Sequence, residues 1–106
     1  MMEIGILGGT GPVGKSLAAR LASVGLDLVI GSRNRYRAME ACDGLIERWG
    51  DRQLSIRPAD NVGAAAAEVV VIATPWDAAA ETARSVARHL RGKVVVCMSN
   101  AIALVA

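Results

Sequence analysis

Apolar residues along this chain form short, largely continuous runs, and between the runs they recur every three or four positions. The runs cover residues 4–7, 26–30, 69–73 and 94–97, and the first two end directly at glycine. Runs of this length are typical of strands that are buried on both faces of a parallel sheet. A shorter segment, residues 53–56, predicts one more strand, the third in chain order.

The segments between the runs have the period of helices. Val13, Leu17, Leu21 and Val24 predict one face of a first helix, which Gly25 is placed to end. A second helix is expected to bury the apolar residues of its own period and to stop before Gly50; these are Ala38, Cys42, Leu45, Ile46 and Trp49.

Two further helical segments are predicted in the second half of the chain. Asp60 is expected to cap a short Ala-rich turn that runs to Ala67. Thr74 suits the cap of a longer helix, Pro75 suits its first position, and Gly92 is placed to end it. The apolar residues that this helix is expected to bury extend as far as Leu90: Ala79, Ala83, Val86, Ala87 and Leu90.

This alternation of strands and helices predicts an α/β fold. Right-handed crossovers give a Rossmann-type, doubly wound parallel sheet with the strand order 3-2-1-4-5. Ligands of such sheets bind outside the carboxyl ends of the strands, where the order reverses between strands one and four. Residues 8–13, 32–33 and 74–76 are therefore expected to line one cleft, with Ser99 and Asn100 next along the edge.

The loop after the first strand matches two phosphate-binding patterns. Gly9, Gly11 and Gly14 form G-x-G-x-x-G, the pattern of a dinucleotide-binding turn. Gly9 and Gly14 followed by Lys15 and Ser16 also form G-x-x-x-x-G-K-S, the pattern of a P-loop. A P-loop enzyme further needs an Asp at the end of an apolar strand to hold magnesium, and neither residues 69–73 nor 94–97 run into one. The dinucleotide interpretation is favoured, and the P-loop stays the alternative.

The end of the second strand favours NADP over NAD. NAD-binding chains place Asp or Glu there for the ribose 2′-hydroxyl, whereas NADP-binding chains leave room for a 2′-phosphate near an Arg. This chain has Ser32 and Arg33 instead of a carboxylate, and Arg35 and Arg37 follow. Arg33 is expected to hold the phosphate, while Arg35 and Arg37 are equally consistent with a solvated helix face.

Composition limits the other classes of function. The chain has 106 residues, 53% of them hydrophobic, which is enough for one compact domain. A net charge of +2 gives no argument for a nucleic-acid partner, and no apolar stretch reaches the ~20 residues of a membrane span. Cys42 and Cys97 are expected to be buried free thiols of a cytoplasmic protein, and no metal site is predicted.

Three segments together resemble the N-terminal domain of the NADPH-dependent coenzyme F-420 reductases. They are Gly-Ile-Leu-Gly-Gly-Thr-Gly-Pro-Val-Gly-Lys at 5–15, Ile-Gly-Ser-Arg at 30–33 and Ala-Thr-Pro-Trp at 73–76. The resemblance implies an oxidoreductase domain that binds NADP(H) and exchanges hydride with a deazaflavin, coenzyme F-420. It also implies that no protein acid or base is needed, because hydride passes between two stacked rings.

By this resemblance each segment contacts a different part of the two cofactors. Thr10, Pro12 and Val13 would contact the pyrophosphate, and Ser32, Arg33 and Arg37 the 2′-phosphate. Thr74, Pro75 and Trp76 would lie towards the nicotinamide and the deazaflavin. The full set of expected cofactor-binding residues is Gly9, Thr10, Gly11, Pro12, Val13, Gly14, Ser32, Arg33, Arg37, Thr74, Pro75 and Trp76.

The length departs from that family, whose members continue into a smaller domain that closes the deazaflavin site. The apolar residues 101–106 suggest a cut within a longer protein, so residues 1–106 are expected to form the NADP-binding domain of a fragment. A non-catalytic NADP-binding module or sensor is the alternative to an oxidoreductase domain. A homo-oligomer is also left open.

Overall fold

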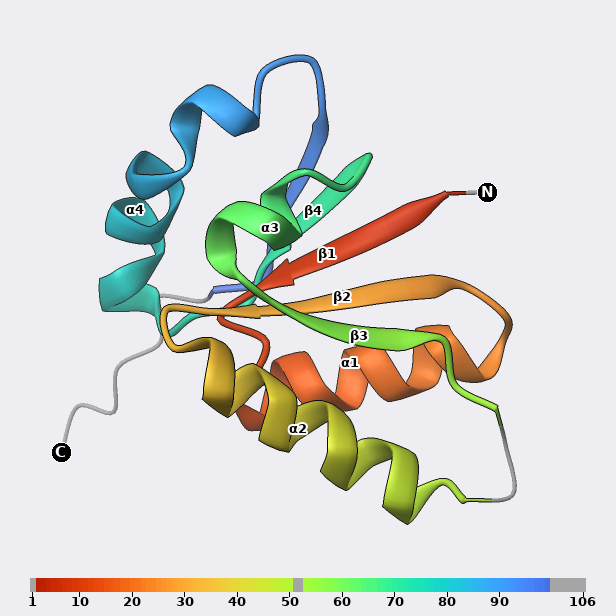
Figure 1. Cartoon of the computed structure of the whole chain (residues 1–106). Helices are drawn as coiled ribbons and strands as arrows, with labels where there is room; N and C mark the ends of the chain where they lie inside the picture. The colour runs from red at the N-terminus through yellow and green to blue at the C-terminus, as the bar shows by residue number, and fades with distance from the viewer. Residues whose placement is uncertain (1, 51–52, 100–106) are drawn as a thin grey trace, which may run out of the picture.

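The computed structural model describes residues 2–50 and 53–99, which form a five-stranded parallel sheet with helices on both faces (Figure 1). The strand order is β3-β2-β1-β4-β5, as the sequence predicts, and every neighbouring pair is parallel. The strands are β1 (Glu3–Leu7), β2 (Asp27–Ser32), β3 (Ile56–Asp60), β4 (Val69–Ile72) and β5 (Val94–Cys97). The helices are α1 (Pro12–Ser23), α2 (Arg35–Arg48), α3 (Asn61–Ala65), α4 (Trp76–Ser85) and the 3-10 turn η1 (Ala87–His89).

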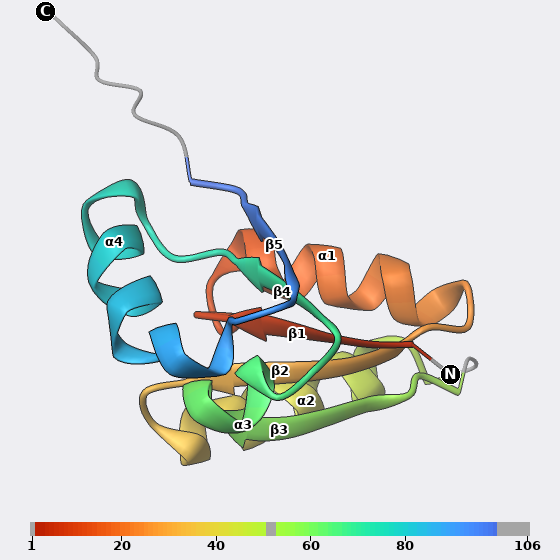
Figure 2. The ribbon, with the colours of Figure 1, turned by 90° about the horizontal axis from the view of Figure 1, so that it is seen from above.

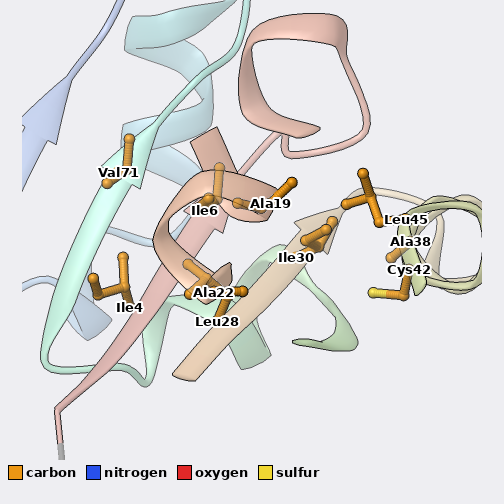
Figure 3. Packing of buried hydrophobic residues seen from close by; sticks show 11 residues of the cluster. Ile4, Ile6, Ala19, Ala22, Leu28, Ile30, Ala38, Cys42, Leu45 and Val71 are labelled. Carbon is orange, nitrogen blue, oxygen red and sulfur yellow. The ribbon is translucent and has the colours of Figure 1, made fainter. Parts of the chain in front are cut away.

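Alternate residues of the central strands build two separate cores. On one face of the sheet, side chains of β1, β2 and β4 pack against α1 and α2 (Figure 3). On the other face, side chains of the same strands pack against α3 and α4. Ile6 and Leu7 are both fully buried although they point to opposite faces. The central strands are therefore covered on both sides, and their carboxyl ends are held in fixed positions relative to one another.

The buried face of α1 differs from the prediction. Val13 and Val24 are 54% and 75% exposed, whereas the buried residues are small: Gly14, Ala18, Ala19 and Ala22. Small side chains let the helix lie close to the sheet, and Leu17 and Leu21 flank this contact as partly buried residues. In α2, Ala38, Cys42 and Leu45 are buried as expected and Trp49 packs against the same core, but Ile46 is 45% exposed.

The predicted position of the third strand is wrong. The observed β3 begins at Ile56, where the prediction ended, and it contains Pro58. A proline is tolerated there because β3 is an edge strand, so its missing N–H interrupts no second ladder. Asp60 caps α3 as expected, since its Oδ1 accepts a hydrogen bond from the Gly63 N–H at 2.7 Å.

The fourth helix starts later and ends earlier than predicted. Its N-cap is Pro75 rather than Thr74, and the Pro75 side chain makes no capping hydrogen bond. α4 stops at Ser85 because Val86, at φ −122°, leaves the helical conformation and buries its side chain in the core. The separate turn η1 then leads towards β5.

β5 lies at the free edge of the sheet (Figure 2). Its side chains are exposed, so the prediction that Cys97 is buried is wrong, whereas Cys42 is buried as expected. No α-helix within residues 2–50 and 53–99 is long and apolar enough to cross a membrane.

Candidate functional site

A cleft of about 560 Å³ lies at the carboxyl ends of the central strands. It is lined by the loop after β1, the ends of β2 and β3, the end of β4 and one side of α4. The lining residues are Gly8, Thr10, Gly11, Ser32, Arg33, Asn34, Arg37, Asn61, Ala73, Thr74, Pro75, Ala78, Glu81, Thr82 and Ser85. The cleft therefore lies at the point where the sequence predicts a ligand. A second hollow of about 550 Å³ is lined by residues of the segment 84–91 only.

The glycine loop is held tightly against the sheet. Gly8 has φ +67°, and a Cβ there would lie 2.4 Å from Cγ2 of Thr74. The Gly9 N–H donates to the carbonyl of Gly31 at 2.9 Å, which joins the loop to the end of β2. A Cβ on Gly14 would lie 2.8 Å from Cα of Gly9, so the first turn of α1 contacts the loop backbone directly. Gly8 and Gly14 are thus required by the fold itself.

Gly11 has no comparable reason to be glycine. It is the N-cap of α1 at φ −78° and ψ 169°, an extended conformation that any residue adopts. A Cβ added to Gly11 would meet nothing within 4 Å among the described residues, and the residue lines the cleft. The open space at the start of a 12-residue helix leaves its first N–H groups accessible to an anion.

The end of β2 carries hydroxyl and guanidinium groups. Ser32 is buried, and its Oγ accepts a hydrogen bond from the Asn34 N–H at 3.2 Å, which leaves the hydroxyl hydrogen free to donate. Asn34 caps α2 by accepting from the Tyr36 N–H at 2.9 Å. Arg33 and Arg37 line the cleft, and the structure shows no ion pair to either from a described residue.

Arg35, between them in sequence, is not among the lining residues. Arg33 and Arg37 therefore line the cleft whereas Arg35 does not, and the sequence alone did not distinguish Arg37 from Arg35.

Thr74 at the end of β4 has an unusual hydroxyl. Its Oγ1 is buried and has no hydrogen-bond partner within the described part of the chain. The Thr74 carbonyl is held by the hydroxyl of Ser99, which donates to it at 2.5 Å. Buried polar atoms are rarely left unpaired, so this hydroxyl suits a ligand group in the cleft. Asn100, predicted beside Ser99, lies outside the described residues.

Asn61, which the sequence interpretation missed, joins three parts of the cleft. Its Oδ1 accepts a hydrogen bond from the Gly8 N–H at 3.3 Å. A Cβ on Gly31 would lie 3.1 Å from the same oxygen. The residue follows directly on β3, so the misplaced third strand concealed its position. A strand predicted as far as Asp60 would have put Asn61 at the carboxyl edge of the sheet.

Comparison with known proteins agrees with this geometry. The sequence profile described as "NADP oxidoreductase coenzyme F420-dependent" matches residues 3–101. The chain belongs to this family. The resemblance noted in the sequence is therefore confirmed.

The relatives are reductases of about twice the length. The F420-dependent NADP reductase of Methanothermobacter thermautotrophicus is 38% identical over 91% of this chain and 42% of its own length. The one from Methanocaldococcus jannaschii is 34% identical over 96% of this chain and 47% of its own. A solved structure from Arthrobacter sp. FB24, described as a candidate F420-dependent NADP reductase, is 29% identical with a TM-score of 0.76 and covers 94% of this chain and 46% of that one. The chain thus spans less than half the length of these relatives.

Within this family the P-loop alternative loses its support. Lys15 and Ser16 would have to face the phosphates of a P-loop, yet neither lines the cleft. Separately, no group of three or more His, Cys, Asp or Glu that could hold a metal ion occurs in the segments 2–50 and 53–99.

Of the twelve predicted cofactor-binding residues, the cleft brings together those from the loop, the β2 end and the β4 end: Thr10, Gly11, Ser32, Arg33, Arg37, Thr74 and Pro75. Gly9 and Gly14 lie behind them and shape the loop. Pro12, Val13 and Trp76 are exposed and do not line the cleft, and Trp76 is 62% exposed.

Proposed function

We propose that residues 1–106 form the NADP(H)-binding domain of an oxidoreductase that exchanges hydride between NADP(H) and coenzyme F-420. The observation that carries the proposal is the open space at Gly11, next to a β2 end that has arginines and no carboxylate. The relatives' names support coenzyme F-420 as the second partner. The glycine loop and the residues at the end of β2 support the dinucleotide.

The glycine loop would receive the pyrophosphate. Without a side chain at Gly11, a phosphate can approach the backbone N–H groups at the start of α1, where the helix dipole favours negative charge. Gly14 allows α1 to pack against Gly9, which brings those N–H groups close to the sheet edge.

The β2 end would hold the 2′-phosphate. Ser32 can donate its hydroxyl hydrogen, and Arg33 and Arg37 can donate paired N–H groups to phosphate oxygens. The bond from Asn34 fixes the Ser32 oxygen in position before any ligand binds. The site is therefore organised around an anion rather than around a ribose diol.

The β4 end would face the nicotinamide side. The Thr74 hydroxyl can pair with a polar group of the ligand, and the bond from Ser99 holds the Thr74 backbone in place. When bound, NADP(H) supplies or accepts the hydride. The role of the protein at this end is to position the ring, which is a large part of catalysis when two reactants must meet in one geometry.

Parallel calorimetric titrations with NADPH, NADH and Mg-ATP test this function. We expect NADPH to bind tightly, NADH weakly and Mg-ATP not at all. Arg33→Ala should weaken NADPH binding by about 1.5–3 kcal/mol, the scale of a hydrogen bond to a charged group, and should leave NADH nearly unaffected. Arg35→Ala removes the same charge outside the cleft and is the matched control. Equal losses for both cofactors in Arg33→Ala would contradict the assignment.

A second assay separates an oxidoreductase domain from a binding module. Two proteins are tested: the chain alone, and a chimera in which the chain replaces the matching part of a full-length relative. Each is mixed with NADPH and oxidised coenzyme F-420, and the loss of deazaflavin absorbance is followed. NADPH binding without hydride exchange in either form would favour a non-catalytic module.

A further inference from the structure

Asn61 holds the glycine loop by one atom of its side-chain amide and leaves the other atom available. Since Oδ1 accepts from the Gly8 N–H, the amide orientation makes Nδ2 a donor. No residue in the described segments accepts a hydrogen bond from Nδ2, although Asn61 lines the cleft and is only partly exposed.

The Asn61 side chain lines the cleft near the end that is assigned to the 2′-phosphate. The Asn61 oxygen lies 3.1 Å from where a Cβ of Gly31 would be, and Gly31 directly precedes Ser32. Gly31 in turn accepts the Gly9 N–H through its carbonyl. Asn61 therefore lies where β1, β2 and β3 converge, beside the residues assigned to the phosphate.

We propose that Asn61 is a specificity-determining residue that helps the cleft to prefer a 2′-phosphorylated dinucleotide. This inference rests on the proposed function. The neutral amide holds Gly8 and donates to the phosphate, whereas a carboxylate at the same place would repel the phosphate. The same carboxylate would accept hydrogen bonds from the ribose diol of NADH, as the acidic residue of NAD-binding sites does from the end of strand two.

Asn61→Asp tests the charge without removing the loop contact. A carboxylate oxygen can still accept from the Gly8 N–H, so the thermal midpoint should stay close to that of the wild type. We expect the NADPH dissociation constant to rise about tenfold or more and that of NADH to stay within about threefold. Val62→Asp adds the same charge at an exposed neighbour that does not line the cleft, and should leave both constants unchanged.

Asn61→Ala gives a second, uncharged test that stands even if the Asp variant does not fold. It removes the donor, so the affinity for NADPH should fall more than the affinity for NADH. The fall in NADPH affinity should be smaller than in Asn61→Asp. If Asn61 only holds Gly8, Asn61→Ala should weaken NADPH and NADH binding by the same factor. In that case Asn61→Asp should also leave the ratio of the two dissociation constants unchanged. Either result overturns the inference.

The wild-type titration keeps the two proposals apart. Selective NADPH binding by the wild type with an unchanged ratio in the Asn61 variants overturns only the role of Asn61. Binding of neither cofactor by the wild type overturns the proposed function and this inference together.

Discussion

Gly11→Ala separates the demands of the ligand from those of the fold. Apart from its chain neighbours, no atom of the described residues lies within 4 Å of the new methyl group, and the backbone conformation is one that alanine adopts freely. With a dinucleotide bound, the same methyl group would occupy the space through which the pyrophosphate reaches the start of α1. The substitution should therefore affect binding and leave folding almost unchanged.

The expected stability change is small because two effects oppose each other. Alanine is a poorer N-cap than glycine by up to about 1 kcal/mol. Replacing glycine also reduces the freedom of the unfolded chain, which stabilises by about 0.4–1 kcal/mol. The net change should stay within about 1 kcal/mol, or about 4–8 °C in the thermal midpoint for a chain of this size. Gly14→Ala places a methyl group 2.8 Å from the Gly9 Cα and should cost about 1–3 kcal/mol.

Gly11→Ala should weaken dinucleotide binding strongly although it changes stability little. Loss of a hydrogen bond to a charged phosphate corresponds to about 10- to 100-fold in the dissociation constant. NADPH and NADH share the pyrophosphate, so calorimetry should show equal factors for both. Thermal unfolding followed by circular dichroism gives the stability of each variant. Wild-type NADPH affinity in Gly11→Ala would refute the placement of the pyrophosphate, and a large fall in its midpoint would show a structural role for Gly11.

Three further predictions concern the core and the two cysteines. Gly5→Ala should destabilise the protein by about 1–3 kcal/mol or more in chemical denaturation, because the new Cβ would lie 1.9 Å from the Ala64 carbonyl oxygen. The control is Gly44→Ala, whose Cβ would meet no described residue within 4 Å other than its neighbours in the same helix. Equal stability of the two variants would contradict the contact. Burial and the neighbouring Asp43 raise the pKa of the Cys42 thiol from 9.0 to about 11. As the pH rises, the Cys42 thiol thus keeps its proton to a higher pH in the folded state than in the unfolded chain. The wild type should therefore lose stability between pH 9 and 11 relative to Cys42→Ala. If the free energy of unfolding of both proteins depends on pH in the same way, the effect is excluded. At neutral pH a thiol reagent should modify exposed Cys97 well before Cys42.

The fold could be predicted from the sequence because its strongest signals are local. Continuous apolar runs and the glycine that follows each of the first two identify the central strands, and crossover handedness then gives the strand order. The position of the edge strand β3 was missed because its residues 56–60 form no apolar run, and Pro58 argues against a strand unless its edge position is known. The buried face of α1 was misjudged because close packing favours alanine over valine there.

The candidate site could be predicted where a sequence pattern defines the backbone. It could not be predicted where a side chain of one element contacts the backbone of another. Gly11 and Arg33 belong to segments whose spacing carries the information. Asn61 is distant from Gly8 in sequence, and only the assembled sheet brings them to 3.3 Å. The separation of Arg37 from Arg35 likewise depends on which side of the first turn of α2 faces the cleft.

The contact beneath Gly5 connects the core to this site. Because residue 5 has no side chain, the backbone of α3 lies directly on β1 at Ala64, three residues after Asn61. Any side chain at position 5 would push α3 away from the sheet and move Asn61 away from the Gly8 N–H. Gly5→Ala should therefore weaken dinucleotide binding even under conditions where the protein remains folded, although Gly5 is buried in β1 and does not line the cleft. Unchanged affinity in a folded Gly5→Ala protein would mean that the glycine loop holds its shape without Asn61.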